Sequence, residues 1–181
     1  RSLEGTASSP LDFLAGGGTV VFGPDDSVLT VSVPVVGDSL DEYDESMQVR
    51  LSGAMESALG DSVGAGTILD NDTAPAVHVA GLRIAEPSTG SVFAAFRIRL
   101  DRPSAKPISF DWGTLPGTAT AGADYSSASG SMGLAAGSRD STVLVQVLSD
   151  SIAGEGDETF QVRLSALSNT LPGDTSATGV I

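Results

Sequence analysis

The chain contains no cysteine among its 181 residues and only one histidine, His78. Without cysteine it can form neither a disulfide scaffold nor a thiolate metal site. A zinc site would need mostly carboxylate ligands, which zinc seldom prefers, because the chain offers a single imidazole. Stability must therefore come from packing, with bound ions as a further contribution.

Basic side chains are scarce as well. Nine Lys and Arg stand against 23 Asp and Glu, which gives a formal net charge of −14 at pH 7. The long-range field of such a chain repels nucleic acid and anionic membrane surfaces and attracts cations. We therefore expect no nucleic-acid partner, and metal cations are the favoured ligands.

Long hydrophobic runs are also missing. No apolar stretch approaches the roughly 20 residues that a membrane-spanning helix needs, and no basic-then-apolar leader opens the chain. We expect no membrane insertion. The sequence begins RSLEGTASS at Arg1 rather than with Met, so we expect a piece of a longer protein, with the neighbouring domains of that protein as partners.

No segment carries a sustained helical stripe, whereas strand-like alternation recurs throughout. Clear examples are SVFAAFRIRL at 91–100, PISFDWG at 107–113 and STVLVQVLS at 141–149. Alternation of Val, Ile and Phe with polar residues indicates strands with one buried face. Clusters of Gly, Ser, Asp and Pro separate these runs at short intervals. The pattern predicts an all-β fold, an antiparallel β-sandwich.

The sequence repeats itself over the length of a whole domain. GTASSPLDF at 5–13 aligns with GTATAGADY at 117–125 at an offset of 112, and QVRLS at 48–52 aligns with QVRLS at 161–165 at an offset of 113. The repeat predicts the end of a first domain over 1–72, a linker over 73–76 and a second domain over 77–181. The fold expected is thus one and a half tandem copies.

The first copy lacks the opening strands of the second. Its strand candidates lie near 14–22, 27–36, 45–53 and 63–69, and the second copy has three more candidates before GTATAGADY. Half a sandwich leaves apolar faces and unpaired strand edges in water. We therefore expect self-association through the truncated first domain, or poor order in its first segment.

The order of these motifs carries a family resemblance. The pattern G-T-A-x-x-x-x-D-[FY], then a spaced Asp, then an acidic run leading into an alternating strand, and finally Asn71-Asp72 after the last strand, resembles the Calx-β domain of sodium/calcium exchangers, integrin β4 and bacterial surface proteins. The resemblance implies an immunoglobulin-like sandwich of seven strands. It also implies calcium binding by carboxylates from loops at one end.

Calcium prefers six to eight oxygen ligands, and clustered carboxylates repel one another unless a cation lies among them. In the second copy the resemblance points to Glu86, Asp124, Asp150, the Ile152 carbonyl, Glu155 and Glu158. In the first copy it points to Asp12, Asp38, the Leu40 carbonyl, Glu42, Glu45, Asp70 and Asp72. The first copy has no counterpart to Glu86, and the second has none to Asp70 and Asp72. Solvated acidic turns are the alternative to metal sites.

An enzyme is not expected. No G-x-S-x-G nucleophile elbow is present, and the single histidine lies in an apolar alternation. Glu155 and Glu158 could serve as a glycosidase pair. However, an exposed acidic turn gives neither of the two carboxyl groups an apolar pocket that would raise its pKa. Trp112 is expected in the sandwich core, with a sugar-stacking platform as the alternative.

These observations favour a non-catalytic calcium-binding module of a larger extracellular or cell-surface protein. Its expected role is that of a calcium-rigidified spacer or an adhesive module. The alternative is a calcium-independent scaffold or ligand-binding module attached to a secreted enzyme.

Overall fold

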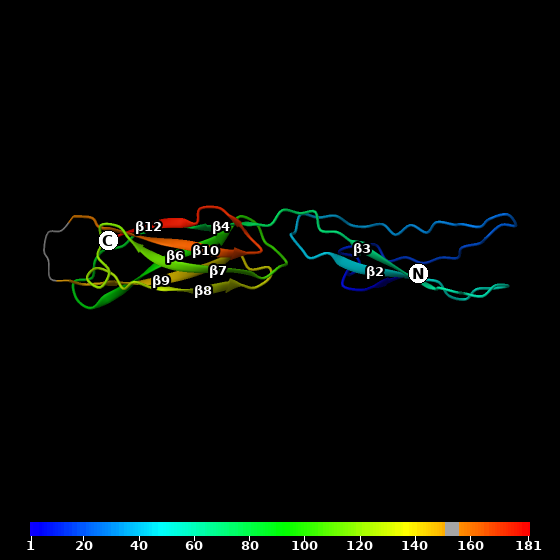
Figure 1. The fold of residues 1–181 in the computed structure, drawn as a ribbon, viewed down its shortest axis with the longest axis horizontal. Helices are drawn as coiled ribbons and strands as arrows, with labels where there is room; N and C mark the ends of the chain where they lie inside the picture. The colour runs from blue at the N-terminus through cyan, green and yellow to red at the C-terminus, as the bar shows by residue number, and fades with distance from the viewer. Residues whose placement is uncertain (151–155) are drawn as a thin grey trace. The chain divides into compact units, whose positions relative to one another are not determined.

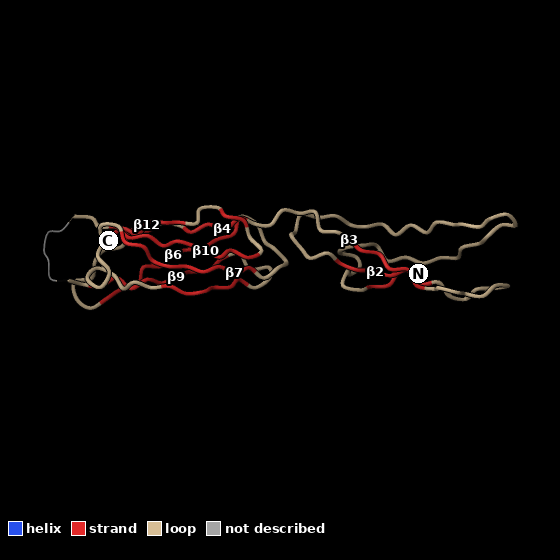
Figure 2. The backbone as a smooth tube through the Cα atoms, in the orientation of Figure 1, coloured by secondary structure: helices blue, strands red, loops and turns tan. Residues whose placement is uncertain are grey.

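The computed structural model describes residues 1–150 and 156–181 of the chain. All of its regular elements are strands, which confirms the all-β prediction (Figures 1 and 2). Within the described residues, no helix is long and apolar enough to span a bilayer. The chain divides into two compact units, Arg1–Asp72 (unit 1) and Thr73–Ile181 (unit 2).

Unit 2 is a sandwich of two sheets. One sheet has the strand order β5-β12-β10-β7-β8 and the other β11-β4-β6-β9. The strands are β4 (Ala76–Val79), β5 (Leu82–Arg83), β6 (Ser91–Leu100), β7 (Ile108–Pro116), β8 (Ser129–Leu134), β9 (Asp140–Leu148), β10 (Thr159–Ser168), β11 (Leu171–Pro172) and β12 (Ser176–Val180). Most pairs are antiparallel, but β11 pairs with β4 and β5 pairs with β12 in parallel.

The core of unit 2 follows from period-two alternation. Along β6, Ala94, Phe96, Ile98 and Leu100 are fully buried while the residues between them are exposed. Across the sandwich, the Phe160 ring meets Phe96 edge to face at 5.6 Å between centroids. Inward-facing side chains of both sheets therefore close one continuous core, as expected for an aligned sandwich.

Unit 1 holds a three-stranded antiparallel sheet of order β1-β2-β3. Its strands are β1 (Ser2–Glu4), β2 (Glu45–Arg50) and β3 (Val63–Ile68). The pairs Ser2↔Val49 and Met47↔Gly66 of this sheet match, at the offsets of the repeat, the pairs Thr114↔Val162 and Phe160↔Gly179 of unit 2. The sheet of unit 1 is therefore the register-for-register counterpart of the end of β7 together with β10 and β12.

The core of unit 1 is small. Three apolar side chains are buried, Ala7, Phe13 and Met47, and Val33, Val49 and Ile68 pack against them. At the offsets of the repeat, the three buried residues correspond to Ala119, Tyr125 and Phe160, which belong to the core of unit 2. Unit 1 thus buries one side of the sandwich core without the second sheet.

Two strands expected in unit 1 are not formed, so the predictions for 14–22 and 27–36 were wrong. The bridge Phe13↔Val35 pairs the residue just before the first segment with the second segment, and the Leu14 N–H donates to the Pro34 carbonyl at 2.9 Å. Their counterparts in unit 2, β8 and β9, pair with β7 and β6. Residues 1–72 include no segment that aligns with β6 or with the part of β7 that pairs with β8. Alternation over 14–22 and 27–36 therefore finds no neighbouring strand to bond to.

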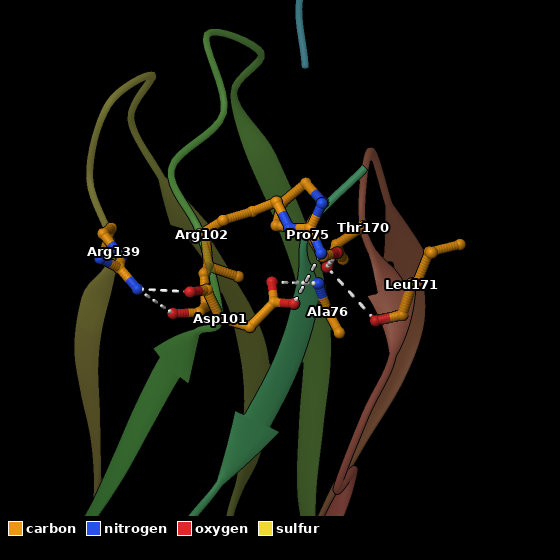
Figure 3. Close-up of polar contacts among 8 residues, drawn as sticks. Pro75, Ala76, Asp101, Arg102, Arg139, Thr170 and Leu171 are labelled. Atoms are coloured by element: carbon orange, nitrogen blue, oxygen red, sulfur yellow. Dashed lines mark hydrogen bonds and ion pairs between the residues drawn. The ribbon is translucent and has the colours of Figure 1, made fainter. Parts of the chain in front are cut away.

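A group of hydrogen bonds surrounds Pro75 near the start of unit 2 and is called here the brace at Pro75 (Figure 3). The Pro75 carbonyl accepts hydrogen bonds from the Leu171 N–H at 2.8 Å and from the Thr170 hydroxyl at 2.7 Å. The next residue, Ala76, donates its N–H to the Asp101 carboxylate at 2.8 Å, and the Asp101 N–H returns to the Ala76 carbonyl at 3.1 Å. Pro75 and Ala76, near the start of unit 2, are therefore hydrogen-bonded on both sides of the chain.

Candidate metal centre

Unit 1 contains an acidic cleft of about 220 Å³ at the end of its sheet where β2 begins and β3 ends. Every ligand predicted for the first copy lines this cleft: Asp12, Asp38, Leu40, Glu42, Glu45, Asp70 and Asp72. They come from three separate stretches of sequence, around Asp12, over 38–45 and over 70–72, and the fold gathers them at one place.

Three of these carboxylates approach closely. One oxygen each from Asp12, Glu42 and Glu45 lies within 4.8 Å of the others. Calcium binds oxygens at about 2.3–2.6 Å, so two oxygens held by one ion lie at most roughly 5 Å apart. The spacing and the all-oxygen chemistry of the three groups therefore fit a calcium ion.

Asp12 is positioned by its own turn. Its carboxylate accepts hydrogen bonds from the Ser8 N–H at 2.7 Å and the Ser8 hydroxyl at 3.0 Å. The following residue, Phe13, is fully buried and anchors the turn to the core. The first carboxylate of the cleft is thus held by packing and by hydrogen bonds to one of its two oxygens.

The acidic loops are held together by backbone donors. Glu42 N–H donates to Asp70 at 3.2 Å, Asp70 N–H donates to Asp44 at 3.0 Å and Asp72 N–H donates to Asp70 at 3.1 Å. Leu40 N–H donates to Asp38 at 2.8 Å. Carboxylates that cap backbone N–H groups in this way keep both loops in place around the cleft.

The surroundings of the cleft disfavour the ionised form of two of its glutamates, Glu42 and Glu45. Partial burial raises the pKa of Glu42, and the charges of Asp38, Asp12, Asp70 and Asp72 raise it further. Partial burial and the neighbouring Asp12 also raise the pKa of Glu45. The pKa of Asp12 is lowered instead, chiefly by the Ser8 backbone hydrogen bond. Like charges held this close favour a bound cation or a bound proton.

The predicted ligands of unit 2 are arranged differently. Asp124 accepts the Thr120 N–H at 2.6 Å, as its counterpart Asp12 does from Ser8. Glu86 accepts the Asp150 N–H at 2.7 Å, and Glu158 exchanges backbone hydrogen bonds with Ile181 at 3.1 and 2.8 Å. Among the residues that the structure describes in this unit, no three acidic groups gather as they do in unit 1.

Two predicted ligands of unit 2, Ile152 and Glu155, lie outside the described residues. Their part in a site, like the whole ligand set of both units, stays a prediction.

One ion pair near the predicted ligands of unit 2, between Arg83 and Asp157, was not expected from the sequence. The Arg83 guanidinium, at the end of β5, makes two hydrogen bonds to Asp157, at 2.8 and 2.7 Å. This pair lowers the pKa of Asp157. Sequence reasoning missed it because the partners lie 74 positions apart. It also omitted Asn71 and Tyr43, which line the cleft of unit 1, although Asn71 stands between two predicted ligands.

Comparison with known proteins places both units in one family. A family model described as the Calx-beta domain matches residues 1–73 and 82–180. Among solved structures, calcium binding domain CBD12 of CALX1.1 superposes with a TM-score of 0.52 at 23% identity, covering 58% of this chain and 44% of that one. CBD12 from CALX1.2 gives 0.52 and 23%, covering 58% and 43%. The apo-form Calx CBD1 domain gives 0.51 and 22%, covering 60% and 96%.

At these identities the structural likeness shows the fold alone, and the chain spans less than half the length of the two CBD12 structures. No curated protein sequence matches the chain. The family model, by contrast, covers nearly all of both units, so the resemblance expected from the sequence motifs is confirmed. The chain belongs to the Calx-beta family and carries two matches to its domain in tandem.

Proposed function

We propose that unit 1 binds one calcium ion in the acidic cleft. The observation that carries the proposal is the approach of the Asp12, Glu42 and Glu45 oxygens to within 4.8 Å of one another. The further acids of the cleft and the raised pKa of Glu42 support it, because a divalent cation relieves the repulsion that raises that pKa. A similar solved structure is itself described as a calcium binding domain.

The proposed role is mechanical and non-catalytic. An ion among these carboxylates ties the turn that holds Asp12, the acidic run before β2 and the Asp70–Asp72 segment to one another. The last of these segments leads directly into the linker at 73–76, so calcium would stiffen unit 1 up to its junction. Such a module suits a spacer or adhesive part of an extracellular protein, where sites of modest affinity are filled because calcium is abundant.

Calorimetric titration of the full chain with calcium tests the proposal. We expect binding in unit 1, and Glu42→Gln should weaken it by about tenfold or more because affinity follows the charge of the ligand set. The matched control is Glu56→Gln, which makes the same chemical change in the exposed β2–β3 connection, at the other end of the β2–β3 ladder.

Two results would contradict calcium binding at this cleft. One is the absence of any binding at millimolar calcium, and the other is equal weakening by the two variants. The first result would favour a calcium-independent scaffold or ligand-binding module. In that case, the acids would be an ordinary solvated surface.

A further inference from the structure

The carboxylate of Asp44 lies just beyond the end of the β2–β3 ladder of unit 1. The last pair of that ladder is Glu45↔Ile68. One residue before Glu45, the side chain of Asp44 accepts the Asp70 N–H at 3.0 Å. A side-chain oxygen thus continues the hydrogen bonding where the backbone pairing stops. Asp44 thereby fastens residues 69–72, called here the closing segment, to the acidic run before β2.

The closing segment matters for the cleft because it brings two carboxylates to it. Asp70 and Asp72 both line the cleft, and the charges of both raise the pKa of Glu42. The Glu42 N–H in turn donates to the Asp70 carboxylate at 3.2 Å. The closing segment is therefore bonded to the acidic run at two points, through the carboxylate of Asp44 and through that of Asp70. Only Asp70 belongs to the predicted ligand set.

Asp44 itself does not line the cleft. In unit 1, which the structure describes throughout, Tyr43 and Glu45 line it on either side of Asp44, but Asp44 does not. Nor is Asp44 among the acids whose charges raise the pKa of Glu42. Its effect on a bound ion would therefore come through the segment that it holds, and not through coordination.

The corresponding residue of unit 2 also holds a second segment, but with a different donor. At the offset of 113, Asp44 aligns with Asp157, which accepts two hydrogen bonds from the Arg83 guanidinium. Arg83 belongs to β5, which pairs in parallel with the end of β12. In both units the acid at this position therefore binds a donor from a segment distant in sequence. The recurrence favours an anchoring role for the position over an ordinary solvated charge.

We propose that Asp44 is a positioning residue for the calcium site of unit 1, an inference that rests on the proposed function. By accepting the Asp70 N–H, Asp44 keeps the closing segment beside the acidic run, so a calcium ion does not have to order that segment on binding. Preorganisation of this kind raises affinity, because less conformational entropy is lost when the ion binds. Asp44 acts in this way without contacting the ion.

Calorimetric titration of single variants of the full chain with calcium tests this role. Asp44→Ala removes the acceptor, whereas Asp44→Asn keeps an acceptor oxygen and removes only the charge. The matched control is Asp61→Ala. The exposed Asp61 carboxylate accepts the Val63 N–H at 3.1 Å, at the other end of the ladder, where Arg50 pairs with Val63. The two alanine variants therefore change the net charge equally, and each removes the acceptor of one backbone N–H.

We expect Asp44→Ala to raise the calcium dissociation constant by about fivefold, because one hydrogen bond of ordinary strength changes an equilibrium by roughly two- to tenfold. Asp44→Asn and Asp61→Ala should each change it by less than about twofold. Equal weakening by Asp44→Ala and Asp44→Asn would overturn the proposal, because the lost charge alone would then explain the effect. So would unchanged affinity in Asp44→Ala, or equal weakening by the two alanine variants.

Amide exchange of Asp70, read by NMR in calcium-free protein, separates this proposal from the proposed function. Asp44→Ala should speed that exchange by about fivefold relative to the wild type and to Asp61→Ala, because an amide that loses its acceptor is open to water. If the wild-type chain bound no calcium, the proposed function would fail, and the role of Asp44 in calcium affinity with it. Unchanged exchange in Asp44→Ala, with calcium binding by the wild type intact, would overturn the positioning role alone.

Discussion

Unit 1 should depend on Phe13 more than on any other side chain. This ring is 0% exposed and is the one aromatic group among the three buried side chains of unit 1. Truncating a buried Phe to Ala costs about 3–5 kcal/mol. Whole domains are stable by only about 5–15 kcal/mol, and the core of unit 1 is half a sandwich. Phe13→Ala should therefore unfold unit 1 or leave it barely stable, and calcium binding should be lost with it.

The matched control is Phe22→Ala, which removes the same atoms from a side chain that is 58% exposed and should change stability by no more than about 0.5 kcal/mol. Hydrogen exchange read strand by strand is the assay, with β6 and β9 of unit 2 as the internal reference. We expect Phe13→Ala to abolish protection in β2 and β3 and to leave the reference strands unchanged. Full protection of β2 in Phe13→Ala, or equal losses in both variants, would refute the reasoning.

Two further predictions concern charge and packing. Folding raises the pKa values of Glu42 and Glu45, so calcium-free unit 1 should gain stability as pH falls from 7 to just above the ordinary glutamate range. Calcium affinity should fall over the same range, because protons compete with the ion. Thermal unfolding and calorimetry at both ends of that pH window test the two directions. Gly179→Ala would set a Cβ 2.8 Å from the Phe160 ring and should destabilise unit 2 by about 1–3 kcal/mol in thermal unfolding, whereas Gly133→Ala, with 3.6 Å of room, should not.

Much of the fold could be predicted because alternation and the repeat are local signals. The run at 91–100 became β6 without a shift at either end, and the two offsets of the repeat matched the observed registers. The acidic cleft was also accessible from sequence, since Asp12, Glu42 and Glu45 recur at the positions of Asp124 and of the acidic run before β10.

What could not be predicted depends on partners far away in sequence. Alternation over 27–36 reports which side chains would be buried in a sheet, but not whether a neighbouring strand exists to bury them. For the same reason Leu3 gave no sign of a strand: three residues at the start of a chain have no period to measure, and β1 forms because β2 offers a free edge. Arg83 reaches Asp157 only through the parallel pairing of β5 with β12.

The brace at Pro75 has a consequence under mechanical load. Tension applied at Thr73 passes along β4, which is bonded to β6 on one side and to β11 on the other. Beside β4, the Arg139 guanidinium donates to the Leu100 and Asp101 carbonyls. The other end of the unit, Ile181, lies at the opposite end of the sandwich (Figure 1). A pull between these points shears several hydrogen bonds together instead of unzipping them singly. Resistance of this kind is set by the rate of unfolding rather than by its free energy, so a modestly stable unit 2 could still transmit force.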